Sequence, residues 1–130
     1  MKQFLSIVVV CTLLCACQKN DNSAPDPSKV TISIQSPAAG QLYRSGDSIR
    51  ITATVTYPSE LHGYEVKVTD SATGLILYDD AEHVHDNHFS IQDIWVNTGT
   101  KSSVMKLELI ADLDHNGTIA EQSFNFNYQP

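Results

Sequence analysis

The fold is decided by the stretch IRITATVTY, residues 49–57, in which apolar and polar side chains alternate without interruption. The apolar side is made by Ile49, Ile51, Ala53, Val55 and Tyr57, and the residues between them are Arg or Thr. Successive side chains of a β-strand point to opposite faces, so this period of two predicts a strand with one buried face. Because no segment with the helical period competes with it, we expect an all-β protein.

The same alternation recurs along the rest of the chain. The predicted strands cover residues 30–35, 48–57, 62–69, 75–79, 88–96, 104–112 and 118–128. Pro, Gly and Asn residues lie between these segments, as expected for turns. Seven short strands in about 100 residues are typical of an immunoglobulin-like or fibronectin-III-like sandwich.

The predicted strand 88–96 departs from the simple pattern. Phe89, Ile91 and Trp95 share a face that Asp93 would also occupy, which places a carboxylate among buried side chains. A β-bulge shifts the following side chains to the opposite face, so we expect one near Gln92 or Asp93. Trp95 is expected to be ordinary core, because the cysteines that flank the tryptophan of antibody domains are absent.

The N-terminus predicts export. Lys2 precedes an apolar run that ends in LCAC, residues 14–17. The run is shorter than the roughly 20 residues of a membrane-spanning helix, and it ends in small residues as at a cleavage site. Residues 1–16 are therefore expected to be a signal peptide. Residues 17–28 are polar and hold two prolines, which predicts a flexible tether before a single domain over residues 29–130.

The composition narrows the classes of function. The 130 residues hold 8 Lys and Arg against 15 Asp and Glu, a formal net charge of −7. This charge repels phosphate, so we expect no nucleic-acid partner. All three cysteines lie within the first 17 residues, so the folded part cannot form an internal disulfide. With no cysteine in the domain, no G-x-S-x-G elbow and no phosphate-binding glycine loop, we do not expect an enzyme.

The sequence carries a resemblance to a known group of proteins. The tetrapeptide LCAC resembles the lipobox of bacterial lipoproteins, in which the last cysteine, here Cys17, becomes the lipidated first residue of the mature chain. The stretch SPAAGQLYRSGDSIRITATVTYP, residues 36–58, resembles the first strands of immunoglobulin-like domains on bacterial cell-envelope proteins. The whole layout resembles small Bacteroidetes lipoproteins that carry one such domain.

This resemblance implies where the protein is and what it does. It implies a lipid anchor to the membrane at Cys17 and a place in the bacterial cell envelope. Gln18, directly after that cysteine, implies the outer membrane. The fold implies a binding module, and no catalytic residue is transferred by the resemblance.

The segment DDAEHVHDNH, residues 79–88, concentrates potential metal ligands. It holds His83, His85 and His88 together with four carboxylates. Imidazole and carboxylate groups suit zinc or copper. In an extended chain His83 and His85 project to the same side, where both can bind one ion. His88 needs a turn at residues 86–87 to join them.

Two more histidines are predicted to lie close to this segment. In a sandwich of seven antiparallel strands, the connections after the second, fourth and sixth strands gather at one end. His62 follows the second predicted strand and His115 follows the sixth. We therefore expect all five histidines at one end, with Asp114 as a further ligand or as an acceptor for an imidazole N–H. Solvated loop histidines are the alternative, since the spacing matches no named zinc signature.

A calcium-binding motif is also present in part. Residues 112–119, DLDHNGTI, match the start of an EF-hand loop. Position twelve of that loop is Ser123 rather than Glu, and both flanks alternate as strands. Asn116 and Gly117 between two alternating segments instead indicate a β-hairpin, so calcium is not expected here.

Two functions therefore remain open. The first is a non-catalytic envelope lipoprotein that displays an immunoglobulin-like module to an unknown protein or glycan. The second is a lipoprotein that binds zinc or copper through the clustered histidines. The candidate metal ligands are His62, His83, His85, His88, His115 and Asp114.

Overall fold

The structure is a computed structural model that describes residues 23–130, and the statements below concern these residues. The predicted signal peptide, Cys17 and the first part of the predicted tether lie outside the described residues. Within residues 23–130, no helix is long and apolar enough to cross a membrane.

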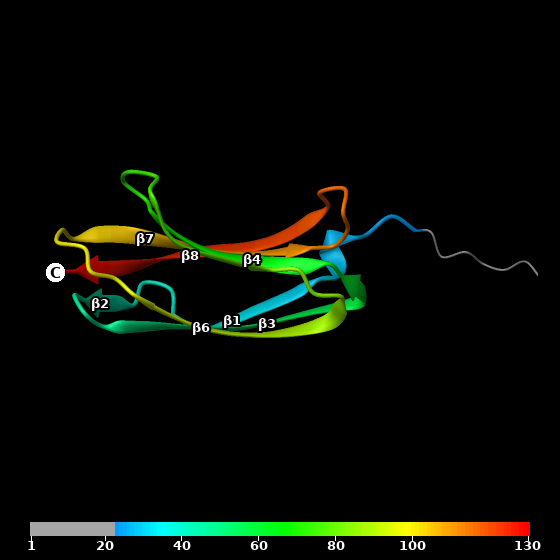
Figure 1. The fold of residues 1–130 in the computed structure, drawn as a ribbon, viewed down its shortest axis with the longest axis horizontal. Coiled ribbons are helices and arrows are strands. Elements are labelled where there is room, and N and C mark those ends of the chain that lie inside the picture. The colour runs from blue at the N-terminus through cyan, green and yellow to red at the C-terminus, as the bar shows by residue number, and fades with distance from the viewer. Residues whose placement is uncertain (1–22) are drawn as a thin grey trace, which may run out of the picture.

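Two β-sheets pack face to face (Figure 1). The three-stranded sheet contains, in spatial order, β1 (Thr31–Ser36), β3 (Ser48–Leu61) and β6 (Asp86–Val96). The five-stranded sheet contains β2 (Leu42–Arg44), β8 (Ile119–Gln129), β7 (Ser103–Asp112), β4 (Gly63–Asp70) and β5 (Ile76–Glu82). The predicted all-β sandwich of the immunoglobulin-like or fibronectin-III-like class is confirmed.

Residues 23–130 form eight strands rather than the seven predicted. The additional strand, β2, has three residues and pairs in parallel with the end of β8. A strand this short shows too little alternation to be recognised in a sequence. At the opposite edge of the five-stranded sheet, β5 pairs with β4 and runs to Glu82, beyond the predicted end at residue 79.

The core lies between the sheets and is built by the alternation that predicted the strands. Ile49, Ile51 and Val55 from β3 and Leu107 and Leu109 from β7 are all at most 1 % exposed. Full burial of each such side chain contributes roughly 1.5 to 3 kcal/mol to folding. Since no cysteine lies within the sandwich, this apolar layer carries the stability of the fold.

The bulge predicted near Gln92 or Asp93 is wrong. The pairing of β3 with β6 runs in continuous register from Ser48 opposite Val96 to Thr56 opposite His88. Asp93 therefore points inward, opposite Ile51. Asp93 lies on β6, an edge strand of the three-stranded sheet, and is only partly buried as a residue.

The irregularity lies instead in β3. Thr56 is opposite His88, and the next paired residue, Leu61, is opposite Asp86. Residues 57–60 of β3 therefore face a single residue, Asn87, of β6. Pro58 lies within this segment and has no N–H to donate to a neighbouring strand, which favours a bulge at this place.

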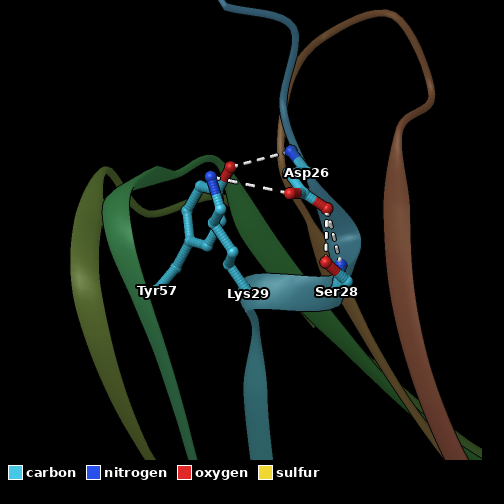
Figure 2. A network of polar contacts seen from close by, with 4 residues as sticks. All are labelled: Asp26, Ser28, Lys29 and Tyr57. Atoms are coloured by element: carbon cyan, nitrogen blue, oxygen red, sulfur yellow. Dashed lines mark hydrogen bonds and ion pairs between the residues drawn. The ribbon is translucent and has the colours of Figure 1, made fainter.

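The N-terminal segment is attached at the same end of the sandwich as this bulge (Figure 1). The 3-10 helix η1 (Pro27–Lys29) begins after Asp26, whose side chain accepts a hydrogen bond from the Ser28 N–H. The Asp26 N–H donates to the Tyr57 hydroxyl at 3.0 Å, and Lys29 pairs with the Asp26 carboxylate at 3.6 Å (Figure 2). These contacts hold the last residues of the predicted tether against the sandwich.

Candidate metal centre

Four histidines meet at the end of the sandwich where three connections turn back. One lies between β3 and β4, two between β5 and β6, and one between β7 and β8. In that order along the chain, they are His62, His83, His85 and His115. The ring centroid of His62 lies 4.4 Å from that of His115 and 4.7 Å from that of His85. The four rings therefore form one contiguous group, which we call the histidine cluster.

The ring nitrogens of this cluster converge. One nitrogen from each of His62, His85 and His115 lies within 4.8 Å of the other two. Two nitrogens bound to one tetrahedral zinc ion lie about 3.3 Å apart, because each Zn–N bond is about 2.0 to 2.1 Å long. To bind one such ion, any pair of these nitrogens that is now further apart than about 3.3 Å would have to move closer. Imidazole nitrogen is a ligand that zinc, copper and nickel accept, whereas calcium and magnesium prefer oxygen.

His62 is the half-buried member of the cluster. Its backbone N–H donates to the carbonyl oxygen of Asp112 at 2.8 Å, which fixes the connection between β3 and β4 against β7. Its Nδ1 atom is buried and has no hydrogen-bond partner. A buried polar atom without a partner has lost its hydration without compensation. A metal ion bound to Nδ1 would provide the missing partner.

Gly63 allows the connection that carries His62 to approach β5. Its φ is +150°, a conformation that residues with side chains rarely adopt. A Cβ atom at this position would overlap the carbonyl oxygen of Glu82 and lie 3.3 Å from the Cα of His83. Because glycine has no Cβ, the start of β4 can lie against the end of β5.

His83 and His85 are exposed and lie on either side of Val84, which packs against the hydrophobic core. Since neighbouring side chains in extended backbone point to opposite sides, the inward Val84 turns both histidines outward together. Their Nε2 atoms lie 3.1 Å apart. The two rings are perpendicular, with centroids 4.8 Å apart.

The turn between β7 and β8 presents His115. The Asp114 carboxylate accepts hydrogen bonds from the N–H of Asn116 at 2.8 Å and from the N–H and hydroxyl of Thr118 at 2.9 and 2.8 Å. The hydrogen bonds from Thr118, followed by those from Asn116, lower the pKa of Asp114. β7 and β8 pair as an antiparallel hairpin, as the sequence predicts. Asp114 thus holds the turn and lies outside the convergent nitrogen group.

His88 also lies outside the cluster, because no turn at residues 86–87 brings it back. β6 already begins at Asp86, so His88 is a strand residue opposite Thr56. Its exposed ring lies 3.3 Å from the Ser90 hydroxyl, measured from Nε2. The structure therefore brings four of the five candidate histidines together and leaves His88 and Asp114 apart from them.

Glu60 is a polar partner of the cluster that the sequence did not reveal. Its Oε1 atom lies 2.9 Å from Nδ1 of His85. The bulge in β3 carries Glu60 to this position, and sequence periodicity does not reveal how far such a bulge displaces a side chain. The one available signal is Pro58, which marks an interruption of strand pairing two residues earlier.

Two hollows flank Glu60 and give access to the cluster. One has a volume of about 650 Å³ and is lined by His62 and Glu60, with Ser23 and Pro25 of the N-terminal segment on another side. The other has a volume of about 400 Å³ and is lined by His85 and Glu60. Solutes can therefore reach the histidines from either side of the β3 bulge.

The fold and the cluster together define a small β-sandwich module with a histidine-lined end. No protein-family model and no curated protein matches the chain. Among solved structures, it is similar to the fibronectin(III)-like modules of Clostridium thermocellum CbhA, with 19% identity, 75% of this chain and 94% of that chain covered, and a TM-score of 0.49.

Two further solved structures are similar to the chain. A chitin binding domain from Burkholderia pseudomallei has 14% identity and a TM-score of 0.46, with 69% of this chain and 57% of that chain covered. The CARDB domain of a Pyrococcus furiosus protein, in complex with di-metal ions, has 11% identity and a TM-score of 0.44, with 78% of this chain and 94% of that chain covered.

Proposed function

We propose that this protein is a non-catalytic β-sandwich module that binds one divalent transition-metal ion, zinc or copper, at the histidine cluster. The proposal rests on the convergence of ring nitrogens from His62, His85 and His115, three residues carried by three separate connections. The unpartnered, buried Nδ1 of His62 supports it, because an ion bound through Nδ1 would satisfy that atom. The ligands are neutral imidazoles, which suit a borderline cation such as Zn²⁺ or Cu²⁺.

Metal titration of the purified protein tests this function. We expect one Zn²⁺ or Cu²⁺ per chain by elemental analysis, and a rise in melting temperature on metal addition, because an ion that binds only the folded state stabilises it. The double variant His83→Ala with His85→Ala should lose both effects. His88→Ala is the matched control and should keep both, since His88 lies on β6 outside the cluster. A wild-type protein that takes up no ion would refute the proposal.

We also propose that the module is tethered to the bacterial cell envelope, at the outer membrane, by lipid on Cys17. The support is the LCAC tetrapeptide at residues 14–17 and Gln18 after it. A tethered module of this kind would hold or hand over metal at the envelope, outside the cytoplasm.

An interaction module with a protein or glycan partner is the second candidate function. The specific support is the hairpin of β4 and β5, which projects from the sandwich (Figure 1) and leaves Leu75 and Ile76 61% and 50% exposed. Large exposed apolar side chains at a sheet edge are a common element of interaction surfaces. Chelator treatment separates the two functions, since partner binding through this edge would survive removal of metal.

A further inference from the structure

His83 lies beside the convergent nitrogens of His62, His85 and His115 without being one of them. Its Nε2 atom lies 3.1 Å from Nε2 of His85. Two nitrogens on one tetrahedral zinc ion are separated by about 3.3 Å, so these two atoms have the spacing of a ligand pair. The His83 ring also lies 5.3 Å from the His115 ring between centroids, so it borders the convergent group on a second side.

Glu60 decides which nitrogen of His85 is available for metal. An ionised carboxylate only accepts hydrogen bonds, so the contact between Glu60 and Nδ1 of His85 requires a proton on Nδ1. In a neutral imidazole the other nitrogen, Nε2, then carries the lone pair. The same Nε2 faces His83, so His83 donates its Nε2 proton to it when no metal is bound.

The backbone supports this assignment. The β3 bulge sets four residues, 57–60, against one residue of β6 and so carries Glu60 over His85. Bulges occur next to functional sites, where they redirect a side chain. A carboxylate that accepts the second N–H of a ligating histidine fixes the ring orientation and the tautomer. Glu60, placed by the β3 bulge, is such a carboxylate for His85.

We propose that His83 joins His62, His85 and His115 to form a closed four-imidazole metal centre, with Glu60 as the positioning residue that makes His85 bind through Nε2. This inference rests on the proposed metal-binding function. On metal binding, the His83 proton moves from Nε2 to Nδ1, so both facing Nε2 atoms offer lone pairs. A tetrahedral centre with four protein ligands leaves no position for water. The site therefore holds an ion for storage or delivery and does not activate water for hydrolysis.

Cobalt substitution tests the fourth ligand. Co²⁺ bound to the wild-type protein should give a tetrahedral visible spectrum that azide does not change, because no coordination position is open. His83→Ala should still bind Co²⁺, but its spectrum should shift with azide, which occupies the vacated position. His88→Ala should match the wild type. An azide-sensitive wild-type spectrum, or an azide-insensitive His83→Ala spectrum, would overturn the assignment of His83.

Zinc affinity and nitrogen NMR test Glu60. Glu60→Ala should weaken zinc binding by about 10- to 100-fold at unchanged stoichiometry, the usual effect of removing such an acceptor. Glu60→Gln should recover part of the loss, because its amide oxygen can still accept from Nδ1. Glu121→Gln, an exposed carboxylate on β8, is the matched control. In the zinc-bound wild type, ¹⁵N shifts should show His85 protonated at Nδ1 and bound at Nε2.

The outcomes separate this inference from the proposed function. If the wild-type protein binds neither Co²⁺ nor Zn²⁺, the metal-binding function itself is wrong. If it binds the ion and azide perturbs the spectrum, metal binding stands and the closed centre is wrong. If Glu60→Ala binds zinc as tightly as wild type, or His85 binds through Nδ1, the role of Glu60 is wrong.

Discussion

Asp93 is a carboxylate on the inner face of the sandwich, and we expect its burial to lower the stability of the fold. Its Oδ2 atom is buried and has no hydrogen-bond partner among the described residues. Burial, and then the negative charge of Asp80, raise its pKa above the ordinary value. The environment of Tyr78 is similar, since burial and then the negative charge of Asp93 raise the pKa of Tyr78 to about 12.

We predict that Asp93→Asn stabilises the protein at neutral pH. With its pKa raised on folding, Asp93 binds its proton more tightly in the folded state than in the unfolded chain. Stability therefore falls as the pH rises from the ordinary pKa of Asp through the raised one. The gain should be about 1 kcal/mol, after allowance for partial exposure, which is about 4 to 8 °C in melting temperature.

Thermal denaturation across pH checks this prediction. The difference in melting temperature between Asp93→Asn and the wild type should be largest at neutral pH. It should vanish below the ordinary pKa of Asp, about 3.9, where both side chains are uncharged. A variant that melts below the wild type at neutral pH would contradict it.

Gly63 is a residue at which we expect a substitution to lower stability, and here zinc affinity should fall as well. Gly63→Ala should destabilise the fold by about 1 to 3 kcal/mol from the positive φ alone, and further from overlap with the Glu82 carbonyl. Because the overlap pushes β5 away, zinc binding should weaken too. Gly74→Ala is the control: its φ is +72°, but a Cβ there meets nothing within 4 Å. Equal metal affinity in the two variants, measured by competition with a chelating dye, would speak against this account.

At the scale of the element, the turn between β7 and β8 links stability to the site. Asp114→Ala should lower the melting temperature and weaken zinc binding, because the hydrogen bonds that shape the turn around His115 are lost. The lowered pKa of Asp114 means that its stabilisation is present above the ordinary pKa of Asp and disappears as the pH falls through the lowered one. The melting temperatures of the variant and the wild type should therefore approach each other at acidic pH. Unchanged zinc affinity in Asp114→Ala would show that the shape of this turn does not affect zinc binding.

The elements also show what alternation can and cannot predict. Strands such as β3 and β7 were predictable because every second residue is buried, which the period of two records directly. The inward Asp93 misled the prediction, since a buried carboxylate and a bulge break the pattern in the same way. The true bulge at residues 57–60 lies where Pro58 interrupts pairing, and its effect on Glu60 depends on three-dimensional geometry. That is why Glu60 was missed.

At the scale of the whole molecule, the histidine cluster was predictable because it depends on chain direction alone. Strands that alternate in direction return to the same end after every second connection, whichever sheet each strand joins. His62, His83, His85 and His115 therefore meet even though β5 pairs with β4 in the five-stranded sheet. Distances between ring nitrogens could not be predicted, because they depend on side-chain rotamers and on the approach allowed by Gly63.

The lipid anchor is a prediction about the whole molecule. Cys17→Ser should move the protein from the membrane fraction to the soluble fraction, because the thiol that carries the lipid is lost. Cys11→Ser, within the same N-terminal segment, should leave the protein in the membrane. Fractionation followed by immunoblotting checks both variants. Retention of Cys17→Ser in the membrane would contradict lipidation at this residue.

If the proposed lipid anchor and metal site both exist, the contact between Asp26 and Tyr57 would limit the distance between the metal site and the membrane. This contact holds the N-terminal segment at the histidine end of the sandwich, and Ser23 lines a hollow beside His62. Five residues, 18–22, lie between Cys17 and Ser23, and even a fully extended chain over those six Cα-to-Cα steps spans only about 20 Å. With lipid on Cys17, the histidines would face the bilayer at short range. Exchange of metal would then favour donors and acceptors at the membrane surface over partners in free solution.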